Sequence, residues 1–261
     1  MIIVKLGGSV ITDKSKDCSF KENVMDNLSK EIKKSNKKIM LVHGAGSFGH
    51  INAKKFKLNQ GYKEINQLHG FATTLENVQR LNSMVLKSLQ KNDINAISIP
   101  PHSILTLSNH KLSQVNYEFF TKYLELNFTP VTFGDVVIDE KLSFSICSGD
   151  LLVMALSKYF KPDKVIFVID EDGIFSSNPK IDKNAKILNN ISTNQLDSLT
   201  FSKDNHADVT GGMKGKIETI KNISKLGIDT ILLNGNKPGR LYKILIGEET
   251  ESTVIKGDKN E

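Results

Sequence analysis

The sequence predicts an α/β protein, a three-layer αβα sandwich with a mainly parallel central sheet. Strand-like and helix-like segments alternate along the whole chain. The strand-like segments at residues 1–6, 39–42 and 164–169 are almost continuously apolar, which is typical of strands buried on both faces. The chain contains no internal repeat, linker or low-complexity block. We therefore expect a single α/β domain over residues 1–261.

The composition suits a globular protein that handles small anions. The chain is 39% hydrophobic over 261 residues, which is enough for a sizeable core. The net charge is +6, but 35 basic residues are scattered among 29 acidic ones and Trp is absent. Base stacking and a basic stripe are thus lacking, so we expect no nucleic-acid partner. A basic surface still attracts phosphorylated small molecules.

The cysteines and the apolar runs indicate the expected compartment. Cys18 and Cys147 are the two cysteines, too few for a disulfide framework or a zinc site. Free thiols are typical of a reducing cytosol. The first residues enter a strand without a signal-peptide pattern, and no apolar run reaches membrane-spanning length. We expect a soluble cytoplasmic protein with no membrane partner.

The first half of the chain alternates between the two kinds of segment. After the strand at 1–6, Gly7-Gly8-Ser9 is expected to break the chain. Helical periodicity predicts helices at residues 20–34, 47–56 and 69–89. Apolar runs predict further strands at residues 38–42, 96–99 and 129–133. Residues 103–126 give no clear pattern.

The second half continues the alternation. A hairpin is expected over residues 136–146, turning near 139–141. Helices are predicted from Ser148 to residue 160, over 192–199, and from the glycine loop at 208–216 to residue 226. Strands are predicted at residues 164–169, at 229–233 and, on a sheet edge, at 252–255. The last residues, 256–261, are expected to fray.

The loop at residues 43–50 is the most informative stretch. It follows an apolar strand, and three glycines within six residues let its N–H groups approach a ligand. The helix that begins near Ser47 points its positive end at the same space. His50 follows the last glycine. The stretch predicts an anion site with a titratable side chain at its edge, or else an ordinary strand-to-helix turn.

Two common phosphate-binding motifs fit this loop poorly. Gly44, Gly46 and Gly49 match the dinucleotide pattern, but the acidic residue expected about 20 residues later is missing from a strand end. A P-loop needs Lys followed by Ser or Thr, where this chain has His50 and Ile51. Neither motif explains the loop.

What remains is a distributed set of cations, glycine loops and carboxylates. The cations near glycine loops are Lys5, Lys14, and Lys214 or Lys216. Asp150 and Asp170 are carboxylates at element ends. Phosphoryl transfer depends mainly on positioning and charge neutralisation, and lysines serve it as mobile point charges. The pattern therefore indicates phosphoryl transfer.

The motifs in order resemble those of the amino acid kinase superfamily, from residue 1 to about 255. Those motifs are residues 5–9, 43–50, 148–150, 170–174 and 210–213. Within the superfamily, residues 7–14 and 43–50 resemble the isopentenyl phosphate kinases. One departure is Ala45, where that family often has a third glycine.

The resemblance implies a reaction and its participants. It implies that ATP and isopentenyl phosphate give ADP and isopentenyl diphosphate, with Mg²⁺ as cofactor and a homodimer as assembly. It also implies a phosphoryl-acceptor lobe over residues 1–160 and a nucleotide-binding lobe over residues 161–261.

The resemblance also implies roles for individual residues. The implied catalytic residues are Lys5, Lys14, His50 and Asp150. The implied ATP-binding residues are Lys5, Gly7, Gly8, Ser9, Gly46, Asp170, Gly211, Lys214 and Lys216. The implied acceptor-binding residues are Ala45, Gly49, His50 and Gly149. No protein ligands for a metal are implied. Asp150 is expected to hold the lysines in place.

Three other functions compete with this prediction. The first is another kinase of the superfamily, of uridylate, glutamate or carbamate type. The second is a non-catalytic nucleotide-binding protein, and the third a dinucleotide-dependent oxidoreductase. A prenyl tail also needs an apolar slot, for which the candidates are Phe71, Leu75 and Val78 with Phe133 or Ile146. Plain core packing explains these side chains equally well.

Overall fold

The computed structural model describes residues 1–177, 182, 184–198 and 212–258. Within these ranges the side chains of residues 194, 197, 198 and 212–214 are not described. In this part of the chain no helix is long and apolar enough to cross a membrane.

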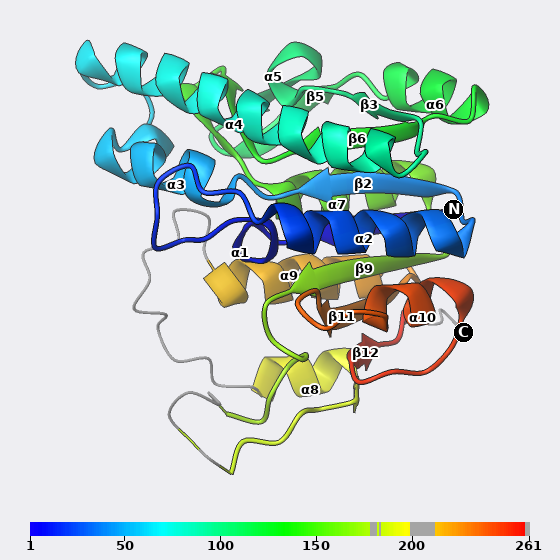
Figure 1. Cartoon of the computed structure of the whole chain (residues 1–261). Coiled ribbons are helices and arrows are strands. Elements are labelled where there is room, and N and C mark those ends of the chain that lie inside the picture. Colours follow the sequence, from blue (N-terminus) through cyan, green and yellow to red (C-terminus); the bar gives the residue numbers. More distant parts are fainter. Residues whose placement is uncertain (178–181, 183, 199–211, 259–261) are drawn as a thin grey trace.

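An eight-stranded sheet forms the centre of the molecule (Figure 1). Its order is β10-β12-β11-β9-β1-β2-β6-β3, and every described neighbour pair is parallel except β11 with β12. The strands are β1 (Ile2–Leu6), β2 (Ile39–His43), β3 (Ala96–Ser98), β6 (Thr129–Phe133), β9 (Lys164–Ile169), β10 (Asn190–Ile191), β11 (Asp229–Asn234) and β12 (Thr253–Ile255). The parallel sheet follows from the apolar strands that the sequence shows.

Helices cover both faces of this sheet, which confirms the three-layer sandwich (Figure 1). One face carries α2 (Glu22–Ser35), α10 (Arg240–Ile246) and the long α4 (Asn66–Lys91). The opposite face carries α6 (Glu118–Glu125), α7 (Gly149–Phe160), α8 (Thr193–Ser198) and α9 (Gly212–Ser224). Each layer of helices closes its own apolar cluster against the sheet.

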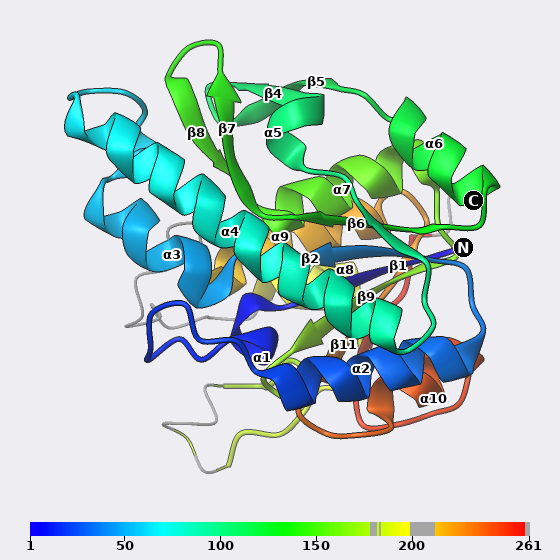
Figure 2. The same ribbon diagram turned by 45° about the horizontal axis from the view of Figure 1, so that its top comes forward.

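A second, four-stranded sheet extends one end of the molecule (Figure 2). It has the order β5-β4-β7-β8, from strands β4 (Leu105–Ser108), β5 (Lys111–Val115), β7 (Asp135–Asp139) and β8 (Ser143–Cys147). The β7–β8 hairpin is the one that the sequence predicts. The short helix α5 (Pro101–Ile104), β4, β5 and α6 occupy the stretch without a clear pattern. Elements of four to eight residues are too short to show periodicity.

The chain departs from the sequence-based expectation in three further places. The helix α1 (Gly8–Ile11) stands where a break was expected. The strand β12 lies one position inside the sheet, because the two-residue strand β10 pairs outside it. The helix α10 was not predicted. Its N-terminal N–H groups at Gly239 and Tyr242 donate to the carboxylate of Glu31, a partner far away in sequence.

Candidate active site

One pocket lies where β1, β2 and β9 end at their carboxyl ends, close to the end of β8. Ligands bind at this edge in open α/β sheets. The pocket encloses about 180 Å³. Its lining includes Lys5, Gly7, Gly8, Ser9, Lys14, Ala45, Gly49, His50, Gly149, Asp150, Asp170 and Lys216. Twelve of the predicted site residues, spread from residue 5 to residue 216, thus come together in one cavity.

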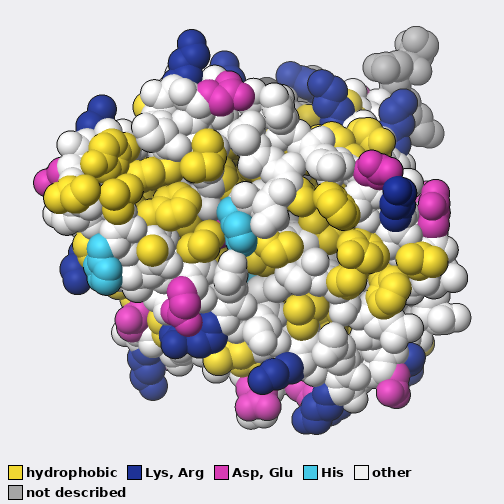
Figure 3. Space-filling model, turned by 90° about the horizontal axis from the view of Figure 1, so that it is seen from above, with side chains coloured by type: hydrophobic (Ala, Val, Ile, Leu, Met, Phe, Trp, Pro, Cys, Tyr) yellow, Lys and Arg dark blue, Asp and Glu magenta, His cyan; other side chains and the backbone are white. Residues whose placement is uncertain are grey.

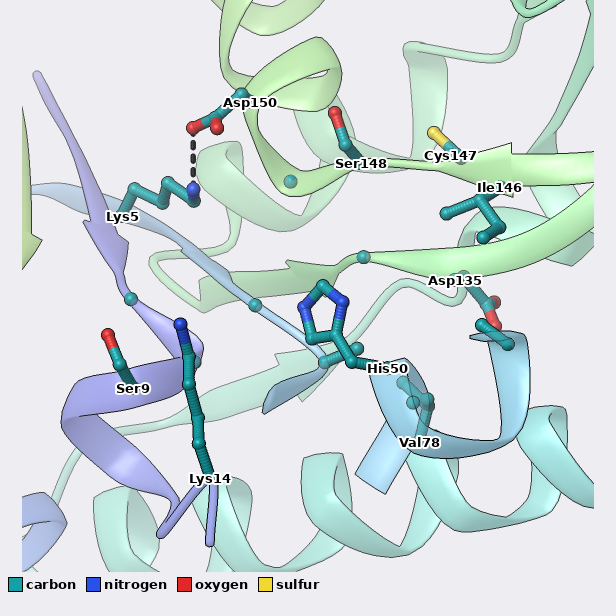
Figure 4. Close-up of a pocket in the computed structure, with 18 of the residues that line it drawn as sticks. Lys5, Ser9, Lys14, His50, Val78, Asp135, Ile146, Cys147, Ser148 and Asp150 are labelled. Atoms are coloured by element: carbon teal, nitrogen blue, oxygen red, sulfur yellow. Dashed lines mark hydrogen bonds and ion pairs between the residues drawn. The ribbon is translucent and has the colours of Figure 1, made fainter. Parts of the chain in front are cut away.

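A buried cluster of two lysines and one carboxylate forms the inner end of this pocket. The Lys5 Nζ atom lies 2.5 Å from Asp150 Oδ1 (Figure 4). The Lys216 Nζ atom lies 3.4 Å from each oxygen of the same carboxylate. Both ammonium groups also lie over the ring of Phe167, at 5.7 and 5.3 Å from its centroid. The arrangement holds a net positive charge on a rigid strand and two helices.

Burial and pairing shift the pKa values of this cluster in a defined way. Burial lowers the pKa of Lys5 to about 8, against the attraction of Asp150, which raises it. Burial by itself would raise the pKa of Asp150, but the charges of Lys216 and Lys5 outweigh it and bring this pKa down to about 2. Near neutral pH the carboxylate is therefore ionised, and Lys5 is mainly charged.

Two glycine loops pack backbone against backbone at the floor of the pocket. A Cβ atom on Gly8 would lie 2.6 Å from the backbone of Gly46, and one on Gly44 would lie 2.7 Å from the Gly8 nitrogen. Gly46 also has a φ of +51°, which side chains rarely adopt. These glycines are thus needed for close packing of the loops. Gly46 is not among the residues that line the pocket.

Thr12 ties the two loops together, a link that the sequence analysis missed. Its hydroxyl donates to the Gly8 carbonyl at 2.6 Å and accepts the Ser47 N–H at 3.0 Å. A threonine four residues after a glycine gives no recognisable signal, because its second partner lies 35 residues away.

Three helix N-termini face the pocket and supply backbone N–H groups. They belong to α1, α3 (Gly46–Lys55) and α7. The Ser148 hydroxyl caps α7 by accepting the Leu151 N–H at 3.1 Å. Gly149 begins this helix where a Cβ would lie 3.2 Å from the Lys5 side chain, so glycine leaves room for that lysine. Helix N-termini favour negatively charged ligands.

Lys14 and His50 form the outer side of the same pocket. Lys14 is exposed on the loop after α1, whereas His50 is half-buried in α3. Figure 4 shows the Lys14 amine and the His50 ring pointing into one space, with Ser9 beside them. The two side chains can approach a phosphate from the side opposite the inner cluster.

Apolar side chains follow directly beyond His50. Ala53, Val78, Val136 and Ile146 line this part of the pocket. Of the predicted slot residues, Val78 and Ile146 therefore reach the pocket. Phe71 and Leu75 do not line the pocket but pack against the small apolar cluster behind its wall, which includes Phe144. Phe133 stacks on His43.

The pocket has further wall residues that the sequence analysis did not single out. Asp135 is buried, lines the pocket, and accepts from His102 Nδ1 at 2.7 Å. Thr74 and Glu171 line it as well. Asp135 lies at the junction between the two sheets, and no local pattern marks a junction. Gly211 and the side chain of Lys214 lie outside the described residues. Lys216 is the lysine that the structure places beside Asp150.

Comparisons with known proteins agree with this arrangement. The pattern of the Amino acid kinase family matches residues 1–234. An isopentenyl phosphate kinase of Methanothermobacter thermautotrophicus is 36% identical over 98% of this chain and 99% of its own length. One of Methanocaldococcus jannaschii is 37% identical over 98% of each chain. A crystal structure of an isopentenyl phosphate kinase superposes with a TM-score of 0.86 at 32% identity, covering 98% of this chain and 100% of its own.

Proposed function

Because the chain belongs to the amino acid kinase family and is an ATP-dependent phosphotransferase, we propose that it phosphorylates isopentenyl phosphate. The relatives that are about one third identical over nearly their whole length are named isopentenyl phosphate kinases. The products are isopentenyl diphosphate, an isoprenoid precursor, and ADP.

One observation carries the choice of acceptor. The outer side of the pocket offers Lys14 and His50, and an apolar wall begins immediately beyond them at Val78 and Ile146. A phosphate head with a short hydrocarbon tail matches both parts. An amino acid acceptor would place a charged ammonium and carboxylate against that apolar wall, which is unfavourable.

The inner cluster acts on the transferring group. The β,γ-bridging oxygen leaves with ADP as a phosphate oxygen of the acceptor forms the new bond to the γ-phosphorus. Lys5 and Lys216 neutralise the charge that develops there, and Asp150 holds both ammonium groups in place. Lys14 and His50 stabilise the acceptor phosphate. A phosphate monoester is already ionised near neutral pH, so no strong general base is required.

Backbone N–H groups and the remaining residues complete the two subsites. Gly7, Gly8, Ser9 and Gly46 belong to the ATP side in this proposal, with Asp170, Gly211, Lys214 and Lys216. Ala45, Gly49 and Gly149 belong to the acceptor side. The lobe of residues 1–160 then binds mainly the acceptor, and the lobe of residues 161–261 mainly the nucleotide. The support is that Asp170 and Lys216 both line the pocket from the second lobe.

We propose Mg²⁺ as a companion of ATP. The described residues contain no group of three or more His, Cys, Asp or Glu side chains placed to hold a metal. Mg²⁺ commonly binds through substrate phosphates with one or two carboxylates, and Asp170 at the pocket rim is such a carboxylate. Bound there, Mg²⁺ would neutralise phosphate charge.

A homodimer in the cytoplasm is the proposed state of the protein. Figure 3 views the molecule from the side of α4 and the small sheet, and shows hydrophobic side chains gathered between charged ones. Large exposed apolar residues on and next to α4 and on α6 include Ile65, Leu68 and Phe119. The free cysteines Cys18 and Cys147 fit a reducing compartment. Light scattering on the purified protein tests the dimer.

The test of the function is ADP release with ATP and Mg²⁺ and one acceptor at a time. The acceptors are isopentenyl phosphate, dimethylallyl phosphate, UMP, glutamate and carbamate. We expect strong turnover with isopentenyl phosphate, alone or with its isomer. Turnover with only UMP, glutamate or carbamate would contradict the proposal while leaving the kinase assignment intact.

A further inference from the structure

His43 is a fully buried histidine at the end of β2, directly before the glycine loop. Its Nδ1 atom lies 3.0 Å from the Gly44 carbonyl oxygen, and its Nε2 atom lies 3.2 Å from Oδ1 of Asn82 on α4. The ring stacks on Phe133 with centroids 5.2 Å apart. The side-chain hydrogen bonds of His43 reach the pocket lining only at Gly44, while its backbone carbonyl accepts the Gly134 N–H at 2.9 Å, so the mechanism above gives the ring no role.

Both ring nitrogens of His43 face oxygen atoms, but only the Asn82 amide can be turned over, so the Gly44 carbonyl decides the tautomer. A carbonyl oxygen only accepts, so Nδ1 must carry the hydrogen that it shares with Gly44. Burial lowers the pKa of His43 to about 4, against the hydrogen bonds with Gly44 and Asn82, which raise it. The ring is therefore neutral near pH 7, and its Nε2 atom carries no hydrogen.

A bare Nε2 atom requires a donor, which Asn82 can provide. The nitrogen and oxygen of an amide are interchangeable in shape, so the hydrogen-bond network decides its orientation. The amide nitrogen of Asn82 lies 2.7 Å from Ser98 Oγ. Turning the amide over places its nitrogen at His43 Nε2 and its oxygen at Ser98 Oγ. The Ser98 hydroxyl then donates to Asn82, Asn82 donates to His43, and His43 donates to Gly44. All donors point in one direction, from β3 to the glycine loop.

The last hydrogen bond of this series, from His43 to Gly44, reaches the pocket. The carbonyl of Gly44 and the N–H of Ala45 belong to one trans peptide and point in opposite directions. Holding the carbonyl against His43 therefore fixes the direction of the Ala45 N–H. Ala45 lines the pocket, and no acceptor for its N–H is found among the described residues. A hydrogen bond to the carbonyl also polarises the peptide and strengthens the N–H as a donor.

We propose that His43, oriented by Asn82 and Ser98, is a positioning residue that aims the Ala45 N–H at a phosphate in the pocket. The proposal rests on the proposed function only for the acceptor used in the assay. It predicts a spectroscopic signature, and differences in activity between variants, that a purely structural histidine would not give.

The signature is the tautomer of His43 in the intact protein. In ¹⁵N NMR of the imidazole groups, we expect a neutral Nδ1–H ring at pH 6–8. Substitution Asn82→Leu removes the donor to Nε2, and we expect it to shift the Nε2 signal of His43 while Nδ1 stays protonated. An Nε2–H tautomer in the wild-type protein, or a ring that titrates near pH 6.5, would overturn the proposal.

The activity test compares two substitutions of the same residue. In His43→Asn, the side-chain nitrogen can take the place of Nδ1 and keep the bond to Gly44. In His43→Phe, the ring and its stacking on Phe133 remain, but the donor is lost. We expect His43→Phe to lose about 10²-fold in kcat/KM with isopentenyl phosphate, and His43→Asn to recover most of that loss. Melting temperatures of both variants are measured alongside.

Each outcome bears on the proposal. Equal losses of activity in the two variants, or losses that follow only the melting temperatures, would contradict it. A wild-type protein that does not phosphorylate isopentenyl phosphate would count against the proposed function instead. The tautomer and the binding of inorganic phosphate by the two variants then still decide the role of His43.

Discussion

The two ends of the pocket use positive charge in different ways. At the inner end, Lys5 and Lys216 are buried and share the carboxylate of Asp150. At the outer end, Lys14 is exposed on a loop. Charges buried with a counter-ion are fixed in direction, but each loses solvation and depends on its partner. An exposed lysine is mobile and can follow a ligand as it enters and leaves.

The difference suggests a division between stability and turnover. Residues of the inner cluster should affect both folding and catalysis, because removing one partner leaves a buried charge. Residues at the outer end should affect catalysis alone. The following predictions test this comparison, beginning with the largest expected effect.

Substitution Asp150→Asn should have the largest effect. It leaves two buried ammonium groups without a counter-charge, and breaking a buried pair typically costs about 3–5 kcal/mol. We expect urea unfolding to show a loss of that size and ADP release to fall by about 10³-fold or more. The control is Glu118→Gln, which breaks the exposed pair with Lys122 and should leave the urea midpoint nearly unchanged. Similar losses in both variants would remove the distinction between buried and exposed charge.

Substitution Lys14→Ala should reduce turnover without reducing stability. Loss of one transition-state donor typically costs about 10²–10³ in kcat, whereas an exposed loop lysine contributes little to folding. We expect the same melting temperature as the wild-type protein. Lys16→Ala, an exposed lysine on the same loop that does not line the pocket, is the matched control. Near-normal rates for Lys14→Ala would remove this residue from the mechanism.

The pH dependence should separate activity from stability at the inner end. With a pKa of about 8, Lys5 in the free enzyme loses its charge above that pH, so kcat/KM should fall by about tenfold per pH unit. An unfolded chain keeps this lysine protonated up to about 10.5. Between about 8 and 10.5 the unfolded state therefore binds more protons, and the Lys5 contribution to stability rises with pH.

Measurements of kcat/KM and of urea unfolding between pH 7 and 10 test this separation. Bound phosphates favour charged Lys5, so kcat should fall at a higher pH than kcat/KM. The Lys5 contribution to stability is the free energy of unfolding of the wild-type protein minus that of Lys5→Met. If this contribution falls with rising pH in parallel with kcat/KM, the account is contradicted.

The sequence revealed the parts of the fold that are encoded locally. Strands such as β1 and β9 are apolar runs, and the glycine loops are recognisable from their glycine content. The small sheet was harder to predict, because β4 and β5 are short and β4 finds its partner β7 about 30 residues later. The helix α1 was missed because two glycines normally end an element, whereas here Gly8 permits contact with Gly46.

Site residues that belong to sequence motifs could be predicted, whereas site residues that are placed by tertiary contacts could not. Lys5, His50 and Asp150 stand in recognisable motifs, and the structure brings all three to one pocket. Thr12 and Asp135 act through partners distant in sequence, so no pattern around them indicates their place. The sequence left open whether Lys214 or Lys216 contacts ATP. The structure places Lys216 beside Asp150, and the side chain of Lys214 lies outside the described residues.

The central claim is that the acceptor phosphate binds on the His50 side and ATP on the side of the inner cluster. Calorimetric binding of isopentenyl phosphate to the wild-type protein and to His50→Ala, with a non-hydrolysable ATP analogue as the second ligand, tests it most directly. We expect His50→Ala to bind isopentenyl phosphate about tenfold or more weakly, and to bind the ATP analogue with unchanged affinity. Unchanged binding of isopentenyl phosphate, or weakened binding of the ATP analogue alone, would contradict the account.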